Sequence, residues 1–127
     1  METKKKVVII DPVLQVIFGG CYYNYKDLYN LGKFDTFDIR QVDYNSDTDT
    51  GNDLVVDDEG LLKANQRYFE FAGVGSFAGV GILTGSDHVT GNSIDTTWTV
   101  DQVQRAISWK PKGFKIDPYM EFIPLRF

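Results

Sequence analysis

The sequence has one cysteine, Cys21, and one histidine, His88, among its 127 residues. A single cysteine excludes an internal disulfide, and so few thiol and imidazole groups leave no cluster with the spacing of a zinc site. The chain also lacks any apolar run near the roughly 20 residues that a membrane helix needs. We therefore expect no metal, no cofactor and no membrane contact.

A secretory signal is also missing from the sequence. Three lysines at positions 4–6 are followed by only four apolar residues, at positions 7–10. The apolar region of a signal peptide needs roughly 7–15 residues. The sequence therefore predicts a cytoplasmic protein.

Apolar residues are plentiful, at 43% of the chain, and aromatic residues make up 14%. That composition supports a packed core and excludes a globally disordered chain. A chain of this length usually forms one domain. With no linker or repeat in the sequence, we expect a single domain over residues 1–127.

Acidic residues are unevenly distributed along the chain. The net charge is −5, but residues 35–59 contain nine acids and only one base, Arg40. An acidic chain is repelled by phosphate backbones, so we do not expect direct binding to nucleic acid. The acidic stretch is either a solvated loop or a surface that imitates nucleic acid or docks on a basic partner. Alternatively, the basic residues near the C-terminus bind an anion. The candidate partner-binding residues are Asp47, Asp49, Asp53, Asp57, Asp58 and Glu59.

Hydrophobic periodicity predicts the secondary structure. β-Branched runs and alternating patterns indicate strands at 6–11, 13–18, 36–44, 53–57, 67–72, 80–84 and 93–98, with a surface loop at 45–52. Asn24 can cap a short helix over 25–31, and Thr99 with Gln102 forms a capping box before a second helix. We expect an α+β fold, with a small mixed or antiparallel sheet of about six or seven strands and two short helices. Residues 110–127 are interpreted as a docking tail or an edge strand over 116–122, which would allow a homo-oligomer.

Glycines are concentrated in residues 73–85. Residues 73–78 match the dinucleotide-binding pattern G-x-G-x-x-G/A, but that motif needs a helix directly after it. Here further glycines alternate with Val80, Ile82 and Leu83, which favours a strand. The structural interpretation is a glycine-rich β connection. The functional interpretation is a backbone that approaches a small ligand, with the candidate binding residues Asn65, Arg67, Phe77, Gly79 and Gly81.

No set of residues indicates catalysis. Ser86, Asp87 and His88 are too close in sequence to converge as a triad. The acidic loop that begins at Asp47 resembles the start of a calcium-binding loop, but its glycine, Gly51, stands at position 5 instead of 6. We therefore expect the protein not to be an enzyme.

Two blocks of the sequence resemble a group of small, functionally uncharacterised proteins of bacteria, phages and other mobile elements. The first is Asp-Asp-Glu-Gly-Leu-Leu-Lys at 57–63, followed by Asn65. The second is Ala-Gly-Val-Gly-Ile-Leu-Thr-Gly at 78–85, preceded by Phe77 where relatives often have leucine. The resemblance implies a compact fold and a mobile-element origin, and it implies no reaction. If a phage encodes the protein, the expected location is the host-cell cytoplasm.

Two functions follow as hypotheses. In the first, a non-catalytic binding protein of phage or mobile-element type occupies a host protein, such as a defence component, through an acidic and aromatic surface. In the second, the protein binds a small ligand or a nucleotide signal at residues 73–85, at a subunit interface if it is an oligomer. The first rests partly on an analogy with other phage proteins of this size.

Overall fold

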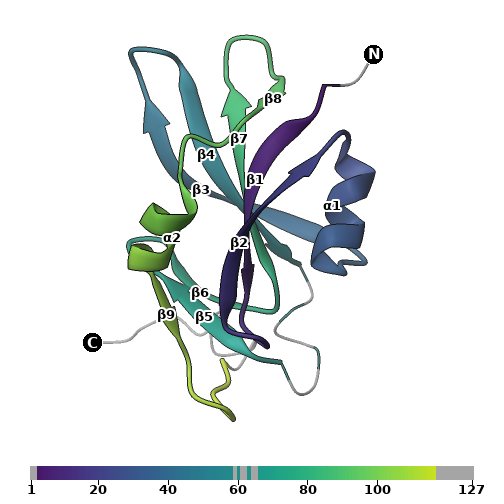
Figure 1. Ribbon diagram of the computed structural model, residues 1–127, viewed down its shortest axis with the longest axis vertical. Helices are drawn as coiled ribbons and strands as arrows, with labels where there is room; N and C mark the ends of the chain where they lie inside the picture. Colours follow the sequence, from purple (N-terminus) through teal and green to yellow (C-terminus); the bar gives the residue numbers. More distant parts are fainter. Residues whose placement is uncertain (1–2, 59, 61–62, 64–65, 117–127) are drawn as a thin grey trace, which may run out of the picture.

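A computed structural model describes residues 3–58, 60, 63 and 66–116, in which the chain forms two helices and nine strands (Figure 1). The α+β class expected from the sequence is confirmed. Glu59, Asn65 and almost all of the strand expected over 116–122 lie outside the described residues.

The larger sheet is antiparallel and has six strands. Its order is β2 (Val16–Tyr22), β1 (Lys5–Asp11), β7 (Gly81–Asp87), β4 (Thr50–Asp57) and β3 (Phe37–Asn45), and β8 (Ser93–Ile94) pairs with the end of β7. The β1–β2 and β3–β4 pairs are local hairpins. Strand β7 lies between them, because Leu83 pairs with Val8 on one side and with Leu54 on the other.

Both faces of the central strands are buried, which explains their consecutive apolar residues. One face contributes Val8, Ile10 and Leu83 to a core with Phe69 and Phe71. The opposite face forms a second core under α1 (Tyr25–Gly32). Its buried members are Val7, Ile9, Tyr22, Leu28, Phe34, Val55 and Ile82.

The smaller sheet covers the first core together with α2 (Val100–Ala106). It has three antiparallel strands in the order β6 (Gly75–Ala78), β5 (Tyr68–Phe71) and β9 (Ile107–Trp109). Phe69 and Phe71 project from β5 into the core and are almost fully buried. Val103 of α2 is also fully buried there.

Both helices begin at the predicted caps. The Asn24 side chain accepts from the Lys26 amide at 3.0 Å, and Asp27 completes a capping box. Thr99 and Gln102 form the second capping box. Helix α1 ends at Gly32, where a Cβ would lie 2.1 Å from the Phe34 ring. Any side chain at that position would have to displace the buried Phe34 ring.

Several strand boundaries differ from the sequence-based prediction. The second strand was expected over 13–18 with the two glycines ending it, yet β2 runs from Val16 to Tyr22. Gly20 pairs with Val7 inside the strand, and a Cβ there would lie 2.7 Å from Ile9 Cδ1. The expected loop over 45–52 is shorter, since β4 begins at Thr50. Strands β6 and β9 were not predicted, and only Ser93 and Ile94 of the expected strand over 93–98 are extended in the sheet.

Candidate functional site

Two hairpin tips project side by side from one end of the larger sheet (Figure 1). The first, residues 44–50, joins β3 to β4, and the second, residues 87–92, joins β7 to β8. The His88 amide donates to the Asp49 carbonyl at 2.9 Å, and the Tyr44 and His88 rings have centroids 5.1 Å apart. These contacts make one surface of the two segments, which we call the paired tip.

The turns within the paired tip are held by short-range hydrogen bonds. Asn45 Oδ1 accepts from the Asp47 amide at 2.9 Å, and Asp87 Oδ1 accepts from the Val89 amide at 2.9 Å. Tyr44 donates its hydroxyl proton to Asp49 Oδ1. This hydrogen bond is the main cause that raises the pKa of the Tyr44 phenol above its ordinary value, because it stabilises the protonated form.

The paired tip is acidic and contains no Lys or Arg. Its carboxylates belong to Asp47, Asp49 and Asp87, and the sequence has no Lys or Arg at positions 41–62 or 68–104. Two large side chains are also exposed there, Tyr44 at 47% and Val89 at 72%. Asp87 was not among the predicted residues, because only the folded hairpins bring it next to Asp49.

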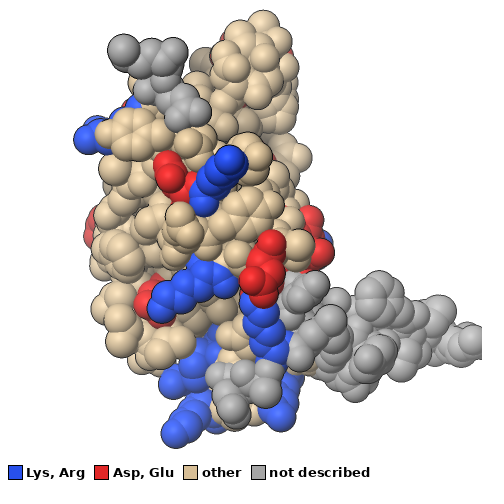
Figure 2. Space-filling view, turned by 90° about the vertical axis from the view of Figure 1, so that its right-hand side faces the viewer, with Lys and Arg blue, Asp and Glu red and all other residues tan. Residues whose placement is uncertain are grey.

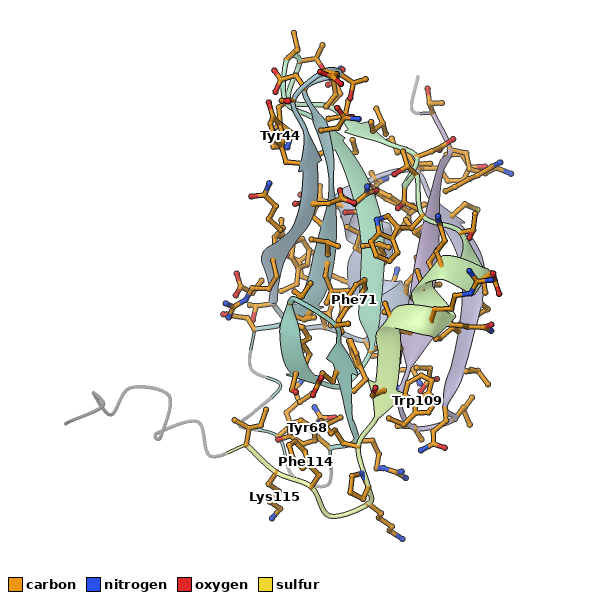
Figure 3. The ribbon with its side chains drawn as sticks, turned by 90° about the vertical axis from the view of Figure 1, so that its left-hand side faces the viewer. Tyr44, Tyr68, Phe71, Trp109, Phe114 and Lys115 are labelled. Carbon is orange, nitrogen blue, oxygen red and sulfur yellow. The ribbon has the colours of Figure 1, made fainter. Side chains whose placement is uncertain are left out.

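The opposite end of the molecule carries basic side chains. Figure 2 shows Lys and Arg gathered at the lower end of the face that it presents. Figure 3 places Lys115 at that end and Tyr44 at the other. The paired tip therefore lies at the end of the sheet opposite this group of basic side chains.

The five acidic candidates that the structure describes do not share one surface. Asp47 and Asp49 lie in the paired tip, whereas Asp57 and Asp58 lie at the far end of β4, roughly 25 Å away at about 3.3 Å per residue. The Asp57 side chain is buried and pairs with Lys63 at 2.5 Å. Asp53 lies between them and accepts from Ser86 Oγ at 2.9 Å.

The ligand-binding candidates are also dispersed. Phe77 lines a pocket of about 460 Å³ between β6 and the adjoining ends of β3 and β4. Gly79 donates its amide proton to the Arg67 carbonyl at 2.9 Å, and Arg67 Nε is buried without a hydrogen-bond partner. Gly81 packs against Phe69, whose ring lies 2.7 Å from the place of a Cβ, so packing explains that glycine.

The pocket beside β6 has an acidic lining. Three carboxylates line it, those of Asp38, Asp57 and Asp58, against one base, Arg40. Arg40 Nε lies 3.2 Å from Asp38 Oδ2, so its charge is already matched. Asp57 is likewise paired with Lys63, so the lining keeps a small net negative charge, which disfavours a phosphate group.

A buried polar network lies next to the paired tip and escaped the sequence analysis. Asn52 is 4% exposed, and its amide nitrogen donates to Asp43 Oδ1 at 2.9 Å and to Thr97 Oγ1 at 2.8 Å. Its oxygen accepts from Thr96 Oγ1 at 2.7 Å and from the Thr97 amide at 3.1 Å. Trp98 Nε1 donates to Asp43 Oδ2 at 2.7 Å. The network ties β3 and β4 to the segment before α2.

Within the part of the chain that the structure describes, no group of three or more His, Cys, Asp or Glu side chains is arranged to hold a metal ion. None of the described helices is long and apolar enough to cross a membrane. Comparison of the chain with protein-family models, with curated proteins and with solved structures finds no match.

Proposed function

We propose that the protein is a non-catalytic binding protein whose paired tip contacts a basic surface of another protein. The observation that carries the proposal is the joining of two hairpins into one surface with three carboxylates and no Lys or Arg. Because Asp49 and Asp87 are held by hydrogen bonds, the acidic surface is largely ordered before a partner arrives.

The exposed side chains of the paired tip support the same function. Aromatic residues are enriched at protein interfaces, and charges around them steer the encounter. Tyr44 and Val89 give the surface an apolar contact area between its carboxylates. The resemblance to proteins of phages and mobile elements leads us to propose a host protein, such as a defence component, as the partner.

A matched pair of charge reversals tests this proposal. Asp47 and Asp58 are both exposed, and they lie at opposite ends of β4. Asp47→Lys and Asp58→Lys therefore change the net charge equally, but only the first alters the paired tip. Bacterial lysate is passed over the immobilised wild type and each variant, and retained proteins are identified and measured at low and high salt.

We expect a protein retained by the wild type and by Asp58→Lys, lost with Asp47→Lys, and weakened by salt. Retention that is equal for the two variants would contradict a role for the paired tip. If neither the wild type nor either variant retains a host protein at low salt, the whole proposal is contradicted.

A second candidate is a small-ligand binder at the pocket beside β6. Its volume of about 460 Å³ falls in the range of small-molecule sites, and Val74 to Ala78 of the glycine-rich segment line it. The carboxylate lining supports a neutral or cationic ligand better than a nucleotide. Thermal shift with a panel of polyamines and a panel of nucleotides, measured on the wild type and on Asp58→Asn, separates cationic ligands from nucleotides.

A further inference from the structure

Strand β2 forms one edge of the larger sheet, at the right of the view in Figure 3. All seven of its residues pair with β1 in unbroken register. Its sequence, Val-Ile-Phe-Gly-Gly-Cys-Tyr, contains no charged residue and no proline. Natural sheets usually protect their edges with charges, prolines or bulges, because a free edge offers its backbone groups to another strand.

The opposite edge of the same sheet has that protection. Strand β3 carries Asp38, Arg40 and Asp43 along its length. Its register with β4 also shifts between Gln41 and Asp43, which is a β-bulge. The two outer strands of the larger sheet therefore differ, because β3 carries charges and a bulge and β2 carries neither.

Exposed apolar side chains gather around β2. The described residues include nine large hydrophobic side chains that are exposed, and six of them lie in β2 or within three residues of its ends. Those six are Val13, Leu14, Val16, Phe18, Tyr23 and Tyr25. Exposed apolar side chains concentrated along one strand are typical of an interaction surface.

We propose that β2 pairs with β2 of a second copy of this chain in an antiparallel, two-fold symmetric dimer. Along two antiparallel strands, hydrogen-bonded and non-hydrogen-bonded residue pairs alternate. A two-fold axis maps each pair onto a pair of the same kind, so it must pass through a pair in which one residue faces its own copy. Gly19 is the midpoint of Val16–Tyr22, so the register that pairs all seven residues sets Gly19 opposite itself. The two six-stranded sheets then become one continuous sheet.

This register is self-complementary in shape. Phe18, 45% exposed, lies opposite Gly20 of the partner subunit, which has no side chain to obstruct the ring. Ile9 leans over Gly20 within the same subunit, so the incoming ring meets an apolar surface. Beyond the strand ends, Val13 and Leu14 of one copy face the segment that carries the partner's Tyr23 and Tyr25.

The net charge of the chain opposes self-association except where the meeting surfaces carry no charge. With a net charge of −5, two copies repel each other over most of their surfaces. The uncharged β2 edge brings no like charges directly opposite each other. It is therefore the edge at which self-association costs least, and its backbone groups bind an extended strand in preference to other shapes.

Cysteine cross-linking tests the register. In the variant Gly19→Cys with Cys21→Ser, the two introduced cysteines oppose each other with Cα atoms about 4.5–5.5 Å apart, within disulfide range. A Cβ at Gly19 has only one contact within 4 Å, Val100 Cγ2 at 3.9 Å, so the subunit accepts the change. In the wild type, Cys21 would lie roughly 14 Å from Cys21 of the partner subunit, because the two are offset by four residues.

We expect mild oxidation to convert Gly19→Cys into a covalent dimer and to leave the wild type uncrosslinked. Gln41→Cys with Cys21→Ser, which places the thiol on the β3 edge, is the control and should cross-link no faster than random collision. Equal cross-linking at positions 19 and 41 would overturn the proposed register.

A second measurement tests the dimer itself by light scattering. Phe18→Lys and Ile39→Lys each add one charge at a half-exposed apolar position, on the β2 and the β3 edge respectively. We expect dimers for the wild type and Ile39→Lys, and monomers for Phe18→Lys. A monomeric wild type at high protein concentration, or a dimeric Phe18→Lys, would overturn the proposal, and neither result bears on the paired tip.

Discussion

Replacing Asn52 by alanine should lower the free energy of unfolding by about 3 kcal/mol. The side chain is 4% exposed and makes four hydrogen bonds, one of them to the Asp43 carboxylate. Three neutral hydrogen bonds at about 1 kcal/mol each and one to a charged group at about 2 kcal/mol give roughly 5 kcal/mol. Because Thr97 is exposed, water replaces part of the loss, which leaves about 3 kcal/mol.

Urea unfolding followed by circular dichroism measures this loss. With a slope of about 1–3 kcal/mol per molar urea, the midpoint should fall by about 1–3 M while the slope stays constant. Asn92→Ala is the control, since Asn92 is exposed in a turn and should change the stability by less than about 0.5 kcal/mol. A loss below about 1 kcal/mol for Asn52→Ala would refute the claim that this network holds the sheet to the segment before α2.

The variant Asn52→Asp separates the network from simple packing. It replaces the amide that donates to Asp43 with a second carboxylate, so two like charges oppose each other. Uptake of one proton by the two carboxylates relieves this repulsion. The destabilisation should therefore be greatest at neutral pH and should diminish in acid. A pH-independent loss would show that charge is not involved.

Two further predictions concern the paired tip and the sheet. Asp49→Asn should lower the pKa of Tyr44 toward its ordinary value, because the carboxylate that holds the phenol proton is gone; alkaline titration at 295 nm, with Tyr44→Phe to assign the signal, checks this. An unchanged titration in Asp49→Asn would contradict the hydrogen bond. Gly85→Ala should lower the free energy of unfolding by about 1–3 kcal/mol, because its Cβ would lie 2.4 Å from the Asp95 carbonyl oxygen. Gly19→Ala, the control, should lower it by less than about 0.5 kcal/mol. Equal changes in melting temperature for the two variants would contradict this packing.

Local signals in the sequence were sufficient for much of the fold. The apolar run at positions 7–10 predicted β1, because a strand buried on both faces has no polar alternation. Side chains three residues apart predicted both helix starts, Asn24 with Asp27 and Thr99 with Gln102. In each case the determining contacts lie within a few residues of one another.

Features that depend on distant contacts escaped prediction. Gly20 looked like a strand end, yet it lies inside β2 to make room for Ile9. Asn52 looked like a loop residue, although partners up to 45 positions away bury it. Asp87 joins the paired tip for the same reason, because its neighbour His88 bonds to Asp49 only after the two hairpins have formed.

The central position of β7 has a consequence for synthesis on the ribosome. The β1–β2 and β3–β4 hairpins precede β7 in the chain, and each presents an apolar strand, β1 or β4, to the space that β7 fills. A nascent chain that ends before residue 81 therefore has two half-sheets and no strand to join them. If a completed neighbouring chain inserts its own β7 between these two half-sheets, the product is a domain-swapped pair. We expect this to be the characteristic misfolded form.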